Sequence, residues 1–207
     1  LEQMSGRVGS TDKEPLLDVV HGFPGTGKSR LIAWLRELME DGLGWQHGVQ
    51  FVCVAFQNAM AAHIGGETIH HWSGIPCRPE QGNTTGDSHQ QSMKFQALRV
   101  LIIDELGMNS AELFGQLEYV VRRAVRSRGT YKKRRDSTTR AFGGVNVLMR
   151  VDWWQLQPVA GTWFCSNPLD VTAGRARDAM EMLWLDGPDT VRRTWNPHRA
   201  HAVQGCL

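Results

Sequence analysis

A glycine-rich stretch of eight residues near the amino end limits the possible folds of this chain more than any other feature. Residues 22–29 read G-F-P-G-T-G-K-S and fit the phosphate-binding pattern G-x-x-x-x-G-K-[ST]. Residues 16–20 before it form a short, mostly apolar run, as expected of a buried strand. Apolar residues from Leu31 to Leu38 recur at helical spacing. This order of strand, glycine loop and helix predicts a phosphate-binding β-α unit.

The chemistry expected of this loop follows from its residue types. Glycines allow the backbone to curl so that successive N–H groups point inward at phosphate oxygens. Lys28 is placed to reach the β- and γ-phosphates of a nucleotide, and the Ser29 hydroxyl to bind Mg²⁺. The helix that follows would direct its positive amino end at the same anion. The sequence therefore predicts a nucleotide site that uses Mg²⁺.

The rest of the chain has the pattern of an α/β fold. Further buried strands are predicted at residues 49–55, 100–103 and 145–149, a helix or turn at residues 58–63, and helices at residues 113–124 and 176–185. Strands that alternate with helices imply a mainly parallel sheet with helices on both faces.

The composition excludes several classes of protein. The chain has 207 residues, a net charge of +2 and four cysteines without a C-x-x-C pair. This spacing argues against a zinc site or a disulfide framework and favours a reducing compartment. No apolar run approaches the roughly 18 residues of a membrane span, and no signal peptide is visible. We expect an intracellular protein with no membrane partner.

An acidic pair follows the clearest predicted strand. Residues 100–103 are V-L-I-I and lead directly into Asp104 and Glu105. In a nucleotide-binding sheet, Asp104 would hold Mg²⁺, usually through water, and Glu105 would orient and polarise the attacking water. A kinase has to exclude water from this position, so the adjacent pair favours hydrolysis. An acidic strand end at a surface turn is the alternative.

A third polar segment follows the last predicted strand. That strand ends in Asp152, and Gln155, Leu156 and Pro158 come shortly after it. In motor ATPases a glutamine at this place can contact the γ-phosphate and report hydrolysis to the nucleic-acid track. The alternative is a proline-terminated edge strand with incidental polar residues.

Four blocks together resemble the Pif-type DNA helicases in the RecD-like branch of superfamily 1, including relatives encoded by Helitron-like transposons. Residues 22–29 are similar to the family's G-x-[AP]-G-T-G-K-S, and residues 59–70 to its A-A-x-x-I-x-G-x-T-x-H. Residues 101–108 resemble its L-I-I-D-E-x-S-M, and residues 142–159 its F-G-G-x-x-x-x-x-x-G-D-x-x-Q-L-x-P-V. The order and approximate spacing of the blocks also match.

This resemblance implies a RecA-like P-loop NTPase domain of a helicase. The family hydrolyses ATP to translocate on single-stranded DNA and to unwind DNA 5′ to 3′, with roles in DNA repair, recombination and telomere maintenance. It also implies placement in the nucleus or the mitochondrion. The region that carries the resemblance is residues 15–165, with a loose lead-in at 1–14 and an incomplete extension at 166–207.

The resemblance also assigns roles to individual residues. Catalysis falls to Lys28, Glu105 and Gln155, Mg²⁺ binding to Ser29 and Asp104, and DNA contact to Thr68 and His70. The residues expected to bind the nucleotide are Gly22, Pro24, Gly25, Thr26, Gly27, Lys28, Ser29 and Arg30.

Several departures from the family pattern bear on activity. The glycine expected before Asp152 is Val151, and the serine of the acidic block is Gly107. No second RecA-like domain, which supplies an arginine finger in these motors, is recognisable in the sequence. Such a finger contributes about 10³–10⁵ in rate, so we expect this chain alone to bind ATP and hydrolyse it poorly. It is then either the first motor domain of a longer protein or a decayed copy.

A basic run adds a second candidate for nucleic-acid contact. Nine arginine and lysine residues crowd residues 122–140, and such a run either follows phosphates or forms a solvated loop. Two rival functions stay open, a P-loop ATPase of another class and a nucleotide-binding remnant without turnover. Stimulation of ATP hydrolysis by single-stranded DNA would separate the helicase from both.

Overall fold

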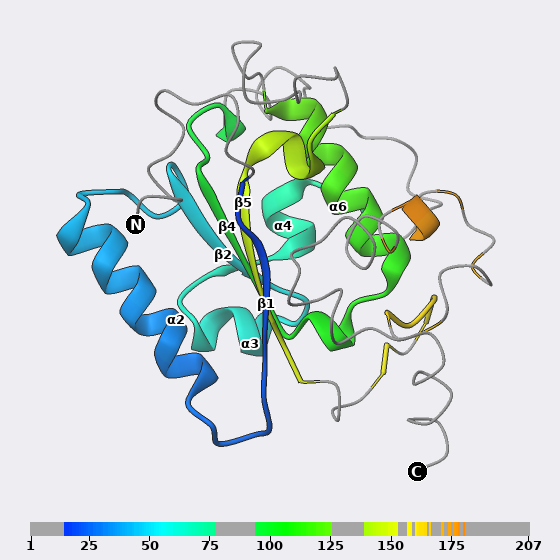
Figure 1. Ribbon diagram of the computed structural model, residues 1–207, viewed down its shortest axis with the longest axis horizontal. Helices are drawn as coiled ribbons and strands as arrows, with labels where there is room; N and C mark the ends of the chain where they lie inside the picture. Colours follow the sequence, from blue (N-terminus) through cyan, green and yellow to red (C-terminus); the bar gives the residue numbers. More distant parts are fainter. Residues whose placement is uncertain are drawn as a thin grey trace.

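The computed structural model is built around one parallel β-sheet (Figure 1). It describes residues 15–77, 94–125 and 139–152, together with positions 157–158, 160–164, 166, 171, 174, 176–178 and 180. The strands are β1 (Leu17–His21), β2 (Phe51–Ala55), β3 (Glu67–Thr68), β4 (Val100–Asp104) and β5 (Asn146–Val151). They lie in the order β1-β5-β4-β2-β3, and every pair is parallel.

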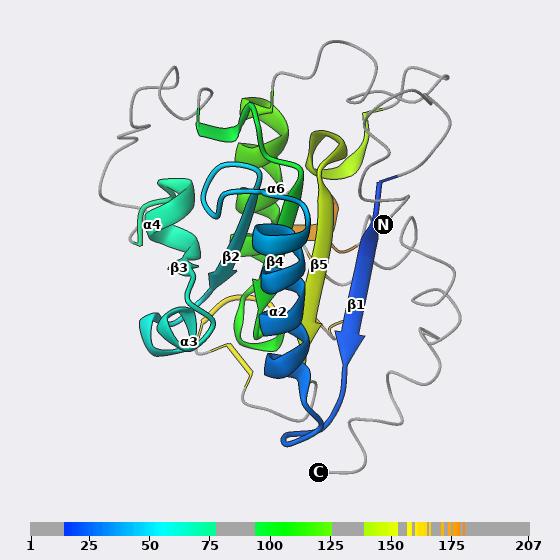
Figure 2. The same cartoon turned by 90° about the vertical axis from the view of Figure 1, so that its left-hand side faces the viewer.

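Helices cover both faces of this sheet, as Figures 1 and 2 show. On one face lie α2 (Lys28–Glu37), which continues into a π-helical turn at Leu38–Gly42, and α3 (Asn58–His63). On the other face lie α4 (Ile69–Ser73) and α6 (Ala111–Ala124). Short 3₁₀ turns at Leu106–Met108 and Ala141–Gly144 complete the described elements. The predicted α/β fold, a parallel sheet with helices on both faces, is confirmed.

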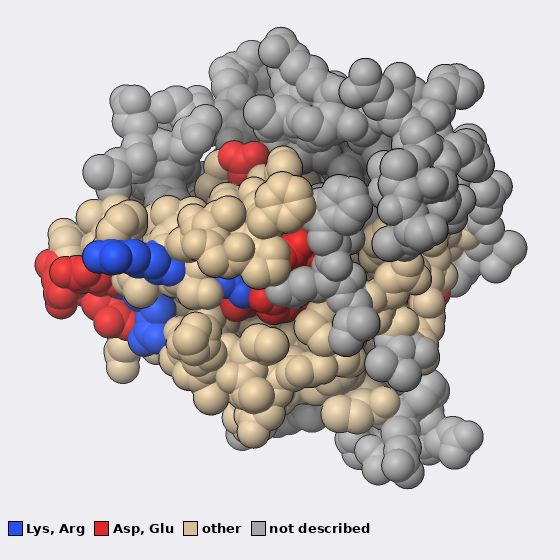
Figure 3. Space-filling model, turned by 90° about the horizontal axis from the view of Figure 1, so that it is seen from below, with Lys and Arg blue, Asp and Glu red and all other residues tan. Residues whose placement is uncertain are grey.

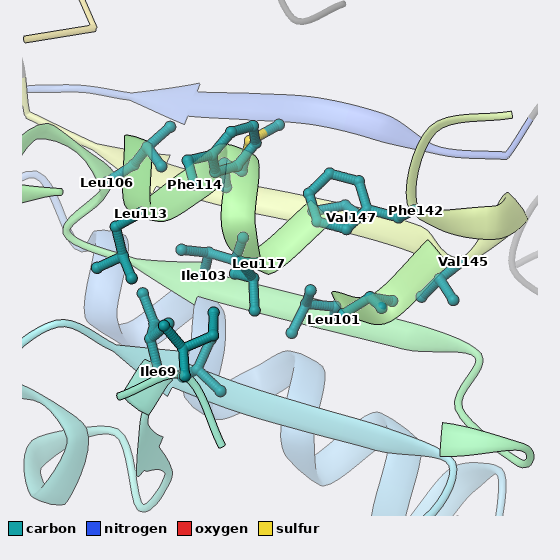
Figure 4. Close-up of a cluster of buried hydrophobic side chains, with 14 of the residues drawn as sticks. Ile69, Leu101, Ile103, Leu106, Leu113, Phe114, Leu117, Phe142, Val145 and Val147 are labelled. Atoms are coloured by element: carbon teal, nitrogen blue, oxygen red, sulfur yellow. The ribbon is translucent and has the colours of Figure 1, made fainter. Parts of the chain in front are cut away.

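The larger hydrophobic core lies between the sheet and α6 (Figure 4). Leu101 and Ile103 on β4 face Leu113 and Leu117 on α6, and all four side chains are buried. Phe142, from the turn before β5, packs edge-to-face on Phe114 with ring centroids 5.4 Å apart. Burying each side chain of this size contributes about 1.5–3 kcal/mol, so this core supplies much of the folding free energy.

A smaller core fills the opposite face, under α2 and α3. Ile32 and Met39 from the helical side meet Phe51, Cys53 and Ile102 from the strands. Residues of β2 and β4 are therefore buried alternately in the two cores, which explains why these strands are apolar at nearly every position.

The sequence misplaced some details of these elements. The apolar residues from Leu31 to Leu38 do not all lie on one buried face, because Trp34 and Leu38 are exposed, at 57% and 38%. The buried positions are instead Ile32 and Met39, seven residues apart, because two helical turns return to the same side. Strand β3 and helix α4 were not predicted at all. Of the helix expected at 176–185, residues 176–178 and 180 are helical and the others lie outside the described residues.

The carboxyl ends of all the strands lie along one edge of the sheet. Thr68 of β3 pairs with Ala55 of β2, and Ala55 pairs with Asp104 of β4. Seen from this edge, side chains of both charges meet near the middle of the face (Figure 3). Ligands of open parallel sheets bind at this edge, so it is where a functional site is sought. Over the described residues, none of the helices is long and apolar enough to span a bilayer.

Candidate nucleotide-binding site

The glycine loop joins β1 to α2 at the carboxyl edge of the sheet. β1 ends at His21 and α2 begins at Lys28, so the loop occupies the six residues between them. Gly25 and Gly27 have φ angles of 80° and 88°, a left-handed conformation that strongly favours glycine. Thr26 closes the turn by donating its hydroxyl to the Phe23 carbonyl at 2.8 Å. The loop has the curled backbone that the sequence predicted.

Lys28 is held inside the loop. Its Nζ donates to the carbonyl oxygens of Gly22 and Phe23, the latter at 2.7 Å. The same Nζ lies 3.8 Å from a carboxylate oxygen of Asp152, whose side chain is fully buried just after β5. The lysine therefore links the loop to the end of β5, the strand that pairs with β1.

The acidic pair lies at the end of β4, the strand on the other side of β5. Asp104 and Glu105 are 1% and 4% exposed, so the alternative of an acidic surface turn is wrong. An Asp104 carboxylate oxygen accepts a hydrogen bond from the backbone N–H of Glu105 at 2.9 Å. Glu105 has φ 51° and ψ 48°, a left-handed conformation rare outside glycine and typical of functional sites.

Arg150 on β5 occupies the centre of this arrangement. Its guanidinium forms ion pairs with the carboxylates of both Asp104 and Glu105. The Nη1 of the same guanidinium donates to the Ser29 hydroxyl at 2.5 Å. The arginine side chain is 9% exposed. One buried cation thus joins the residue after Lys28 to the acidic pair.

The pKa of Asp104 reflects this burial. Loss of water around the carboxyl group raises its pKa to about 6, the neighbouring Arg150 opposes the rise, and Glu105 adds to it. The ion pair with Arg150 favours the ionised form of this carboxyl group.

Two departures from the helicase pattern lie against each other. A Cβ atom added at Gly107 would lie 3.5 Å from a methyl carbon of Val151 and 3.0 Å from the Asp152 carbonyl oxygen. Val151 is fully buried. The small residue at 107 therefore allows the close approach of the Asp152 backbone carbonyl, whereas the contact with Val151 would be an ordinary van der Waals distance.

The residues assigned to DNA contact lie further along the same edge. The Thr68 hydroxyl accepts a hydrogen bond from the His71 N–H at 3.2 Å and so caps α4. The Nδ1 of His70 lies 3.0 Å from the Ile75 carbonyl oxygen. A carbonyl only accepts, so Nδ1 carries the proton and the Nε2 of a neutral His70 is an acceptor. Both residues are partly buried.

Other predicted site residues lie on the surface or outside the described residues. Pro24 and Arg30 are exposed, and the Arg30 guanidinium carbon lies 5.2 Å from the centre of the Trp34 ring. Gln155, the expected γ-phosphate sensor, lies outside the described residues. So does most of the basic run, whereas Arg140 at its end is buried, at 2% exposed, and is not available on the surface.

Sequence reasoning missed Arg150 and the Lys28–Asp152 pair. The available signal was a charged residue inside β5, where N-V-L-M-R-V is otherwise almost wholly apolar. A buried arginine requires carboxylate partners, and β5 lies beside β4 and its acidic pair. The contact could have been inferred only with the strand order known.

A parallel sheet with a glycine loop after β1 and an acidic pair after the central strand β4 defines a RecA-like P-loop NTPase domain. The model of the PIF1-like helicase family matches residues 8–168. The chain belongs to this family, as its four sequence blocks indicated.

Individual relatives agree with the family assignment. The chain is 31% identical over 148 residues to the ATP-dependent DNA helicase RRM3 of Saccharomyces cerevisiae, and 31% over 141 residues to the human ATP-dependent DNA helicase PIF1. These matches cover 67% of this chain, but only 18% and 19% of the relatives. The chain thus spans less than a fifth of the length of either relative.

A solved structure shows the same fold. The Pif1 helicase from Bacteroides in complex with ADP-AlF3 and single-stranded DNA superposes with a TM-score of 0.52 and is 23% identical. The match covers 90% of this chain and 37% of that protein.

Proposed function

We propose that this chain is the ATP-binding motor domain of a 5′-to-3′ DNA helicase, which hydrolyses ATP to translocate on single-stranded DNA. The observation that carries the proposal is the position of Lys28 and Ser29 opposite Asp104 and Glu105, at the carboxyl edge of one parallel sheet. Its family relatives are named ATP-dependent DNA helicases. Roles in repair, recombination and telomere maintenance, and a place in the nucleus or mitochondrion, belong to the same proposal.

Nucleotide binding is the best-supported part. The loop backbone from Gly22 to Gly27 can turn its N–H groups to the phosphates, and α2 adds the positive end of its helix dipole. Lys28 now bonds two loop carbonyls and would exchange them for phosphate oxygens. Gln155, placed by sequence after β5, is proposed to contact the γ-phosphate.

Hydrolysis is assigned to Glu105. Its carboxylate lies beside the phosphate loop and is buried, which suits a group that accepts a proton from the attacking water. The ion pair with Arg150 has to open before the carboxylate can do so. We therefore propose slow turnover in this chain.

Mg²⁺ fits this arrangement poorly. Its expected ligands are Ser29 and Asp104, and both are in contact with the Arg150 guanidinium. The described residues contain no cluster of three or more His, Cys, Asp or Glu side chains that could hold a metal ion. The prediction of a bound Mg²⁺ therefore depends on whether Arg150 moves away.

The test of the enzyme activity is steady-state ATP hydrolysis with and without single-stranded DNA. Lys28→Ala removes a phosphate-binding group, and Glu105→Gln removes the group that accepts a proton from water. We expect slow turnover that DNA accelerates and that both substitutions abolish. Turnover that DNA leaves unchanged would contradict the helicase assignment and favour a P-loop ATPase of another class.

DNA contact is proposed at Thr68 and His70. Both lie at the carboxyl edge of the sheet, and the contact of His70 Nδ1 with the Ile75 carbonyl leaves Nε2 for other partners. We therefore propose that His70 stacks on or bonds to a base.

The matched test replaces each of two adjacent histidines with alanine. His70→Ala should weaken binding of single-stranded DNA by about tenfold without changing its dependence on salt, because no phosphate contact is lost. His71→Ala, which removes an exposed side chain paired with Glu67, should leave the affinity unchanged. Equal effects of the two changes would rule out this role for His70.

A second candidate function is nucleotide binding without turnover. The observation that favours it is the pairing of Arg150 with both acidic residues. Absence of hydrolysis with binding retained, and lost in Lys28→Ala, would support this candidate over the motor.

A further inference from the structure

The side chain of Arg150 is an unusual occupant of a buried parallel strand. β5 lies between β1 and β4, and its other residues are Asn146, Val147, Leu148, Met149 and Val151. The arginine crosses from this strand to Ser29 at the start of α2 and to the acidic pair after β4. It thus reaches groups 121 and 45 residues away in the sequence.

The three partners of Arg150 form one chemical set. They are the hydroxyl and the carboxylate expected to hold a divalent cation, and the carboxylate expected to hold the attacking water. A guanidinium carries a permanent positive charge and donates five hydrogen bonds in a planar fork. It can therefore satisfy oxygen ligands that would otherwise need a metal ion, and still keep donors for a phosphate oxygen.

We propose that the Arg150 guanidinium takes the place of the divalent cation, so that this site binds a nucleoside triphosphate without a metal ion. The inference rests on the proposed nucleotide binding at the phosphate loop. The guanidinium then supplies positive charge to the nucleotide from β5, beside Ser29.

Burial favours the arginine over a metal ion in this competition. The side chain of Arg150 is 9% exposed and those of Asp104 and Glu105 are 1% and 6% exposed. Water therefore solvates the guanidinium little, and its charge is compensated by these two carboxylates. If Mg²⁺ took these ligands, a buried cation would lose its partners beside a second, doubly charged cation. Removing the partners of a buried ion is strongly destabilising.

The geometry also limits catalysis. Glu105 is bound to Arg150 by an ion pair, so its carboxylate is not available to accept a proton from water. Metal-free binding and slow hydrolysis are thus two results of the same contact. A neutral side chain at position 150 should reverse both.

The test measures the affinity of the whole chain for a fluorescent, non-hydrolysable ATP analogue, in Mg²⁺ and in EDTA. For the natural chain we expect the two dissociation constants to agree within about threefold. For Arg150→Met we expect binding to weaken by more than about tenfold when Mg²⁺ is replaced by EDTA. Mn²⁺ retained by the analogue complex, read by electron paramagnetic resonance, should appear in Arg150→Met and not in the natural chain.

Two further variants complete the experiment. Arg99→Met removes an arginine at the opposite end of β4, where its guanidinium lies over the Trp45 ring, and should behave as the natural chain does. Arg150→Lys keeps the positive charge, so its binding of the analogue should depend less on Mg²⁺ than that of Arg150→Met. This variant also allows the test to be made if Arg150→Met does not fold.

The outcomes separate this inference from the function on which it rests. The inference would be overturned if analogue binding needed Mg²⁺ equally in the natural chain and in Arg150→Met. If only Arg150→Lys folds, the same comparison is made with that variant. In either case nucleotide binding itself would stay intact. No binding by any folded variant under either condition would overturn the nucleotide site itself, and the inference with it.

Discussion

At the scale of single residues, the glycine at position 107 allows the Asp152 backbone carbonyl to lie close to the turn after β4. Gly107→Ser should destabilise the chain by about 1–3 kcal/mol, because the new Cβ would lie 3.0 Å from the Asp152 carbonyl oxygen. In a Val151→Gly background the cost should be the same within about 0.5 kcal/mol, since the new Cβ makes only an ordinary contact with Val151 and the coupling should be small. Urea unfolding of the four proteins measures this coupling.

The control for this cycle is Gly174→Ser. A Cβ at Gly174 would have no atom within 4 Å, so the change should stay within about 0.5 kcal/mol. A coupling well above about 0.5 kcal/mol between the Gly107 and Val151 changes would contradict the assignment of the cost to the Asp152 carbonyl.

The cysteines provide a second prediction at this scale. Cys53 is buried in β2, and burial raises the pKa of its thiol to about 12, whereas Cys77 is exposed. At pH 8 only about 10⁻⁴ of the Cys53 thiol is ionised, and only the thiolate reacts readily. Iodoacetamide should therefore label Cys77 in the native protein and Cys53 only after unfolding. Peptide mass spectrometry checks this, and equal labelling rates in the native protein would disprove it.

At the scale of elements, the link from α3 to β3 depends on close contact of two backbones. A Cβ at Gly66 would lie 2.2 Å from the Cys53 carbonyl oxygen and 2.9 Å from its carbonyl carbon, which are backbone atoms of the interior strand β2. Gly66→Ala should therefore cost more than about 3 kcal/mol, since neither backbone can move without breaking the sheet. Thermal unfolding measures the loss.

Gly42→Ala is the matched control for that substitution. Its Cβ would meet only the end of the flexible Leu38 side chain, at 3.1 Å. Its effect on the melting temperature should be small, and an equal loss from both substitutions would exclude the backbone contact as the cause.

Elements with a strong local signal were the ones that sequence could predict. β4 and α6 were recognised because a run of four apolar residues and a regular helical spacing are visible within one segment. β3 has two residues and α4 has five, too few for any period to appear. Lys28, Ser29, Asp104 and Glu105 were found as motifs, whereas the role of Arg150 depends on the pairing of β4 and β5, which no local pattern contains.

At the scale of the whole molecule, the two cores share their strands and should unfold together. Phe114 belongs to the core under α6 and Met39 to the core under α2, and both cores rest on β2 and β4. Phe114→Ala and Met39→Ala should each lower stability, by about 3–5 and 2–5 kcal/mol, within a single transition. Amide hydrogen exchange of α2 and α6 in denaturant tests this, and separate transitions for the two helices would contradict it.

The strand order also determines when the site can exist during synthesis. β1 carries the glycine loop at the edge of the sheet, and the strand it pairs with is β5, which ends at Val151. A ribosome adding 5–20 residues per second needs roughly ten seconds to make the intervening chain. The phosphate loop is therefore the first part of the site to leave the ribosome and the last to be assembled. A nascent chain that stops before β5 has no complete nucleotide site, so bound nucleotide cannot stabilise it against unfolding.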